Sequence, residues 1–186
     1  MDNKTPNWDW ANSILYNMCL DKPNHDDINI TVGKLNIIGR TYSASIERGA
    51  GDNFNIINAA KKINNSKIDE LLKQIRLIDF PTQKNIEDIL EVHKKFTDIL
   101  HRTTGLKKRS LASKYLHFHA PKAFFIYDSI ANKKIREELK HEKLKFKISN
   151  DFDKEYADFA YRCLFFRDNF HKGKSPREID KELLGY

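Results

Sequence analysis

Cysteine and long apolar runs are scarce in this sequence, and both shortages exclude classes of protein. Among its 186 residues the cysteines are Cys19 and Cys163, which lie far apart. A pair of thiols excludes a disulfide scaffold and a zinc site with four cysteine ligands. No run of about 18 apolar residues is present, so we expect no membrane-spanning helix. No apolar stretch follows a basic start at the N-terminus, so we expect no secretory signal and a cytoplasmic protein.

Acidic residues are missing from one stretch, between Asp98 and Asp128, although the chain is rich in charge. Residues 1–100 hold 13 Lys or Arg and 14 Asp or Glu, whereas residues 101–186 hold 20 and 12. The formal net charge of +7 therefore comes from the second part of the chain. The basic residues inside the acid-free stretch are Arg102, Lys107, Lys108, Arg109, Lys114 and Lys122. Such a field favours a polyanion, most often nucleic acid, and the alternative is a solubilising surface without a partner.

The sequence pattern is helical almost throughout. Apolar residues recur every three or four positions from residue 8 to 19 and from 85 to 102. Further helical patterns, separated by Gly and Pro breaks, cover about 32–46, 53–63, 66–80, 108–118, 129–141, 153–169 and 176–184. We find no internal repeat and no series of parallel strands. The sequence predicts one all-α domain over residues 1–186, in which lobes of about 1–23 plus 104–186 and 24–103 flank a cleft.

The segment 103–116 has the pattern of a helical hairpin whose turn contains Gly105. A helix that begins after such a turn offers free backbone N–H groups, and Lys107, Lys108 and Arg109 would stand beside them. These groups suit a phosphate of duplex DNA, in a contact that does not depend on base sequence. The alternative is a helical hairpin whose basic turn is only solvated.

Asp128 follows a wholly apolar run, residues 124–127, which is too short for a helix and predicts a buried connector or a short strand. A helix is expected from Ser129 onward, and Asp128 is well placed to be its N-cap. The carboxylate could serve the cap alone. It could instead point into the cleft, where it would stabilise positive charge on a sugar or act as a general base.

These two segments resemble parts of the helix-hairpin-helix DNA glycosylases. The Arg-Ser-Leu-Ala sequence at 109–112 is similar to the start of the second hairpin helix in that family. The Ile-Tyr-Asp-Ser sequence at 126–129 looks like the segment that carries the essential aspartate of the family. Ser110 precedes Asp128 by 18 residues, which is close to the spacing in the family. Residues 176–184 also resemble the tail of small bacterial proteins with the oxoguanine-glycosylase fold.

The resemblance, which is strongest over residues 103–134, implies an enzyme that flips a modified or damaged base from duplex DNA and cleaves its N-glycosidic bond. It implies that Asp128 stabilises the transition state and that no metal or other cofactor is needed. Ser110 occupies the position of the nucleophilic lysine in glycosylase/lyases, which would remove Schiff-base chemistry. Lys114, one helical turn further on, could supply the amine in a shifted register. The turn has one glycine where the family has two, and the missing cysteine cluster excludes the iron–sulfur form of the family.

Further residues outside the hairpin are candidates for DNA binding or for a metal site. Arg40 lies near Glu47 in a segment that could line the cleft or form a surface ion pair. Tyr127 could stack on an extruded base, although an aromatic residue at this place could equally belong to the core. His117 and His119 would point roughly 200° apart on a helix, so we expect them to share no metal ion.

Three functions therefore stay open at the level of sequence. The first is a DNA N-glycosylase that uses Asp128. The second is a catalytically inactive module on the same fold that binds nucleic acid as a sensor or as a subunit, for example in a defence system. The third is a helical interaction protein with no nucleic-acid role. Base release from modified duplexes, salt-dependent affinity without base release, and preference for an acidic protein over DNA would distinguish the three.

Overall fold

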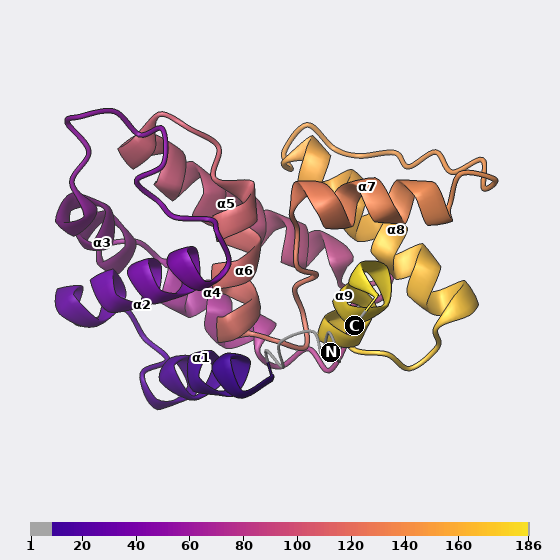
Figure 1. The fold of residues 1–186 in the computed structure, drawn as a ribbon, viewed down its shortest axis with the longest axis horizontal. Coiled ribbons are helices and arrows are strands. Elements are labelled where there is room, and N and C mark those ends of the chain that lie inside the picture. The colour runs from indigo at the N-terminus through magenta and orange to yellow at the C-terminus, as the bar shows by residue number, and fades with distance from the viewer. Residues whose placement is uncertain (1–8, 186) are drawn as a thin grey trace, which may run out of the picture.

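The computed structural model describes residues 9–185, and within that range the chain is all-α, as the sequence predicts (Figure 1). The helices of the described range are α1 (Asp9–Asp21), α2 (Ile28–Thr41), α3 (Ile56–Asn64), α4 (Ile68–Ile75), α5 (Ile86–Thr104), α6 (Arg109–His119), α7 (Ser129–Glu138), α8 (Lys154–Phe170) and α9 (Pro176–Leu184). Within the described range no helix combines the length and the apolar character needed to cross a membrane.

Short polar side chains begin several of these helices. The carboxylate of Asp27 accepts hydrogen bonds from the first turn of α2, and Asp153 does the same for α8. Ser175 and Glu178 form a reciprocal capping box at the start of α9. Since each cap satisfies backbone N–H groups that have no partner inside the helix, local sequence fixes these helix starts.

The helices gather in two groups (Figure 1). Helices α1–α6 lie on one side, here named the N-terminal half, and α7–α9 lie on the other, here named the C-terminal half. A buried connector, residues 124–127, joins them, and α5 packs against α8 across the junction. Aliphatic and aromatic side chains form the core together, and its fully buried aromatic residues include Phe96, Tyr115, Phe124, Phe125, Tyr156 and Phe159. The predicted lobes with boundaries near residues 23 and 103 stay a prediction.

One predicted buried face is wrong in detail. The periodicity of residues 53–63 places Ile57 in the core, whereas its side chain is 47% exposed. Ala60 is fully buried as the same periodicity predicts, and Ala59 and Ile63 are buried beside it. The helix starts at Ile56 after an Asn55 cap, and it turns its alanine face toward α2, because small side chains let two helix backbones approach closely.

Candidate functional site

The turn between α5 and α6 is built as the hairpin pattern predicts. Gly105 ends α5 in the left-handed conformation with φ 70°, and its N–H donates to the carbonyl of His101 at 2.8 Å. Lys108 precedes the first turn of α6 and provides no side-chain cap. The first backbone N–H groups of α6 therefore keep the capacity to bind an anion.

The connector at 124–127 is held in place by side chains of the flanking helices. The hydroxyl of Ser113 on α6 accepts a hydrogen bond from the N–H of Tyr127 at 3.0 Å. His117 bonds through Nδ1 to the carbonyl of Phe124 at 2.8 Å, and Tyr156 donates to the carbonyl of Phe125 at 3.1 Å. These contacts satisfy the polar backbone of a buried segment, and they fix where α7 begins relative to α6.

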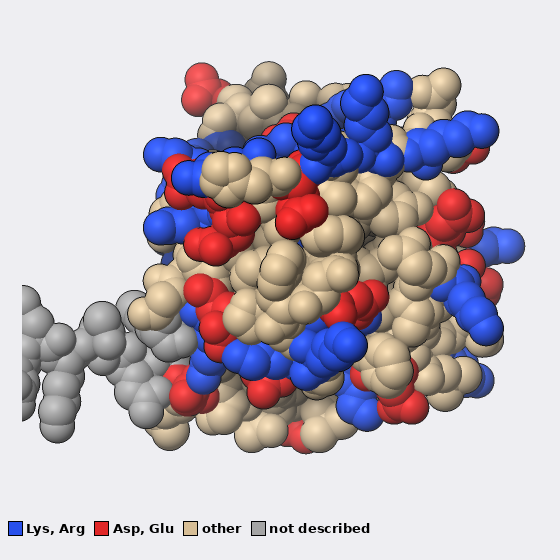
Figure 2. All heavy atoms as spheres, turned by 90° about the vertical axis from the view of Figure 1, so that its right-hand side faces the viewer, with Lys and Arg blue, Asp and Glu red and all other residues tan. Residues whose placement is uncertain are grey.

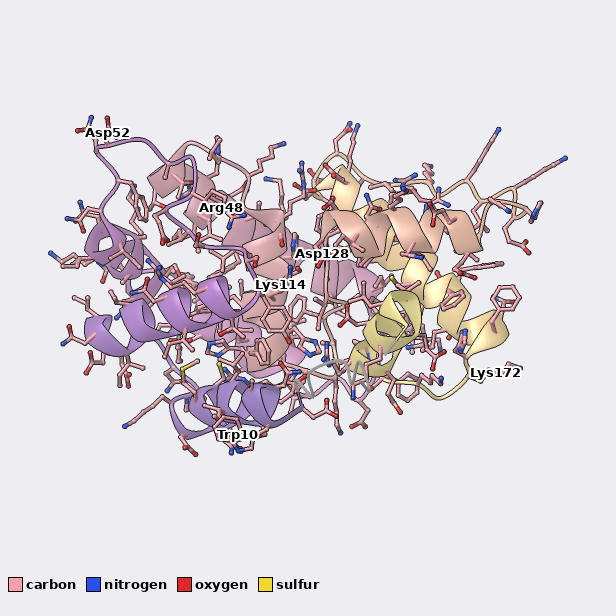
Figure 3. All side chains as sticks on the ribbon, viewed as in Figure 1. Trp10, Arg48, Asp52, Lys114, Asp128 and Lys172 are labelled. Atoms are coloured by element: carbon pink, nitrogen blue, oxygen red, sulfur yellow. The ribbon has the colours of Figure 1, made fainter. Side chains whose placement is uncertain are left out.

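Asp128 and Lys114 form an ion pair between the two halves (Figure 3). Asp128 Oδ1 accepts from the N–H of Ala131 at 2.8 Å and so caps α7, as predicted. Asp128 Oδ2 lies 3.2 Å from Lys114 Nζ, which also donates to Ser110 Oγ at 2.8 Å. Both oxygens of the carboxylate are therefore used, one for the helix and one for the lysine.

Lys114 is the most deeply buried member of this site. Its side chain is 2% exposed, against 28% for that of Asp128. Burial lowers the pKa of Lys114, and the charge and hydrogen bond of Asp128 oppose that shift. A lowered pKa leaves a larger fraction of the amine neutral, which is the form that attacks carbon.

A second carboxylate stands behind the pair. Asp180 on α9 is 3% exposed, and burial raises its pKa to about 6. Its Oδ2 accepts a hydrogen bond from Arg177, whereas its Oδ1 is buried without a partner among the described residues. Asp180 was not predicted as a site residue, because it lies on α9, far from α6 in the sequence, and nothing local indicates that it faces Lys114.

A groove of about 470 Å³ opens above the pair. The 42–48 turn forms one wall, the α5–α6 hairpin forms the floor, and the start of α7 forms the other wall. The predicted residues that line the groove are Lys107, Lys108, Arg109, Ser110, Lys114, Tyr127 and Asp128. Asp128 and the basic turn thus meet at one concave surface.

Arg109 forms ion pairs with two carboxylates of the C-terminal half. Its Nε lies 2.6 Å from Asp153 Oδ1, and its Nη1 lies 2.8 Å from Glu155 Oε2. The hydroxyl of Tyr127 also donates to Glu155. Arg109 therefore fastens the hairpin to the start of α8, and its charge is largely compensated before any ligand arrives.

Lys107 and Arg48 are the exposed cations of the groove. Lys108 bonds to the carbonyls of Ser45 and Arg48, and this holds the 42–48 turn against the hairpin. Lys107 and the Arg48 side chain are left facing solvent. Figure 3 shows Arg48 above and to the left of the Lys114–Asp128 pair, and both line the groove. Arg48 was not predicted as a site residue, since only the fold brings the loop after α2 to the hairpin.

Two predicted DNA-binding residues do not line the groove. Arg40 pairs with Glu47 at 2.8 Å, and its side chain is 71% exposed. Gly105 shapes the turn without contributing to the lining. His117 and His119 are buried with separate partners, and within residues 9–185 no group of three or more His, Cys, Asp or Glu side chains could hold a metal ion.

Comparison with known proteins matches the larger part of the chain to a protein-family model. A family model described as an N-terminal domain matches residues 2–123, which include all of α1–α6. The match thus covers Ser110 and Lys114 and ends before the connector that leads to Asp128. Searches of curated proteins and of solved structures returned no significant match.

Proposed function

Since the chain belongs to the HI_0787_N family through residues 2–123, and its groove combines that region with Asp128, we propose that it binds duplex DNA and cleaves the N-glycosidic bond of an extruded modified or damaged base. The observation that carries this proposal is the Lys114–Asp128 ion pair at the floor of a basic groove. We place this activity in the cytoplasm, where Cys19 and Cys163 would stay free thiols.

Binding rests on the exposed cations and on the uncapped start of α6. Lys107 and Arg48 supply positive charge at the rim, and the N–H groups of α6 supply donors for one phosphate. Neither contact reads base sequence, so the DNA backbone would be bound in the same way whatever its base sequence. Specificity would come from the extruded base inside the groove.

Cleavage rests on the two charged groups at the floor. When the bond between C1′ and the base breaks, its electron pair leaves with the base and positive charge develops on the sugar. Asp128 provides negative charge for that sugar in a partly desolvated site. Lys114 can then bond to C1′ as a neutral amine after it yields a proton to the departing base, or a water can take its place.

The test is a base-release assay combined with borohydride trapping on a panel of damaged and modified duplexes. Release with a trapped adduct assigns the amine of Lys114 as nucleophile, and the adduct should disappear in Lys114→Gln. Lys34→Gln is the matched control, because Lys34 is also buried but donates only to backbone carbonyls. Release without an adduct supports hydrolysis directed by Asp128. Absence of release from every duplex contradicts the enzymatic proposal.

A second candidate function, binding without catalysis, is favoured by the pairing of charges within the groove. Arg109 and Lys114 are already neutralised by carboxylates. The resemblance to the helix-hairpin-helix glycosylases also implies that Ser110 stands where the glycosylase/lyases have their nucleophilic lysine. A module of this kind would hold nucleic acid through Lys107 and Arg48. Salt-dependent DNA affinity in a protein that releases no base would support it.

A further inference from the structure

A row of lysines follows α7 on the outside of the C-terminal half. Lys143, Lys145 and Lys147 alternate with Leu144, Phe146 and Ile148 in a segment without helix. The three lysines are exposed, whereas the three apolar side chains are half-buried against the core. This alternation of two is what an extended chain produces when one of its faces is anchored.

The anchored face gives the segment a fixed position. The ring of Phe146 stacks on that of Tyr161 with centroids 5.2 Å apart and planes 17° apart. The guanidinium group of Arg162 lies 5.9 Å from the centre of the same Phe146 ring. The lysines are therefore presented from a defined surface, which lowers the entropic cost of contacting a ligand.

The row is connected to the groove. Figure 1 shows the segment after α7 running back along the top of the C-terminal half toward the junction of the halves. It ends at Asp153, whose carboxylate binds Arg109 at the start of α6. In Figure 2, Lys and Arg gather along the upper edge of this side, at the height of α7 and of this segment in Figure 1.

The positive charges of the row are opposite in sign to the phosphates of a nucleic-acid strand, and their spacing is comparable. Side chains on one face of an extended chain recur roughly every 6.6 Å, while a DNA strand has a phosphate about every 3.4 Å along the axis. Three lysines thus give about one positive charge for every two phosphates. Glu142 is the acid within residues 139–150, and Lys140 offsets it.

We propose that Lys143, Lys145 and Lys147 form a second contact surface for the DNA backbone. This surface binds the DNA strand at the point where the strand leaves the groove. This surface rests on the proposed DNA-binding function and deepens it, because it adds a direction to the bound duplex. It does not depend on whether Lys114 and Asp128 cleave a bond.

The test compares two triple variants by fluorescence anisotropy with a labelled duplex at several salt concentrations. In Lys143→Gln/Lys145→Gln/Lys147→Gln, we expect the slope of log K against log salt to become shallower by about 2 to 3, and the affinity at about 100 mM salt to fall at least ~10-fold. The matched control, Lys61→Gln/Lys73→Gln/Lys84→Gln, removes the same charge from exposed positions of the N-terminal half and should leave the slope unchanged.

Three results would overturn the proposal. The first is a slope in the 143/145/147 variant that equals the slope of the control. The second is a wild-type protein that binds no DNA at all. The third is a variant that loses binding only to anionic-lipid vesicles and keeps its DNA affinity. Because affinity is measured apart from base release, a wild-type protein that binds DNA without releasing a base contradicts the glycosylase proposal and leaves this surface standing.

Discussion

At the scale of single residues, Asp128 both caps α7 and faces the lysine of the groove. Its Oδ1 satisfies an N–H of α7, and its Oδ2 faces Lys114 Nζ at 3.2 Å. Most aspartates at helix starts serve the helix alone. Here the second oxygen reaches Lys114 because the connector at 124–127 brings the start of α7 against the middle of α6. The cap thus orients the carboxylate for the groove.

The burial of Asp180 should make the free energy of unfolding depend on pH. Burial raises its pKa to about 6, above the ordinary value of 3.8. The folded state therefore binds this proton more tightly than the unfolded state, so the stabilising contribution is complete below about pH 4 and is lost as the pH rises toward 6. We expect the free energy of unfolding of wild type, relative to Asp180→Asn, to fall by about 2–3 kcal/mol across this interval.

Urea unfolding of both proteins at several pH values measures this difference. Asp79→Asn is the control, because Asp79 pairs with Lys122 at the surface and is 80% exposed. Its difference from wild type should stay small at every pH. A difference in the free energy of unfolding between wild type and Asp180→Asn that did not change with pH would contradict a raised pKa of Asp180.

At the scale of elements, the connector depends on Ser113. The hydroxyl of Ser113 accepts from the buried N–H of Tyr127, so Ser113→Ala leaves that N–H without a partner. We expect a loss of about 1–3 kcal/mol in the free energy of unfolding, together with weaker base release, because α7 and Asp128 lose their support. Ser149→Ala, which removes an exposed serine bonded to Asp151, should cost much less in a parallel denaturation series.

Several helix starts are what the sequence predicts best, for local reasons, whereas the helix predicted over 32–46 is wrong at its end, because α2 stops at Thr41 and residues 42–48 form a turn. The caps at Asp27, Asp128, Asp153 and Ser175 act within four residues, and the apolar periodicity of 85–102 is complete within α5. The connector is also buried as predicted, and the described chain forms no strand there.

Contacts between distant elements are what the sequence could not predict. The carboxylates that neutralise Arg109 come from positions 153 and 155, and Arg48 reaches the groove from the loop after α2. The spacing of 18 residues drew attention to Ser110 and Asp128, whereas the direct ion pair joins Asp128 to Lys114. These pairings depend on how helices pack, which single-sequence patterns do not record.

At the scale of the whole molecule, a buried polar network holds the N-terminal half together. His25 Nδ1 lies 2.6 Å from Asp69 Oδ1, and its Nε2 lies 2.8 Å from the hydroxyl of Tyr115 on α6. Burial lowers the pKa of His25, so its ring is neutral near pH 7. The network links the α1–α2 loop, α4 and α6, and it thereby supports the floor of the groove from behind.

Asp69→Asn should destabilise the molecule by about 2–3 kcal/mol, because the amide cannot accept both hydrogen bonds that His25 donates. Guanidinium unfolding followed by circular dichroism measures the loss, again with Asp79→Asn as the exposed control. The midpoint should fall while the helical signal before unfolding stays that of wild type. A midpoint equal to that of the control would contradict a supporting role for the network.

The central claim is that Asp128 acts on the sugar of a bound nucleotide rather than only on its own helix. The most direct measurement is base release by Asp128→Asn at matched DNA occupancy, with Asp27→Asn as control, since Asp27 caps α2 away from the groove. We expect Asp128→Asn to keep the fold and the DNA affinity and to lose base release, while Asp27→Asn should release base like wild type. Undiminished release by Asp128→Asn would contradict it.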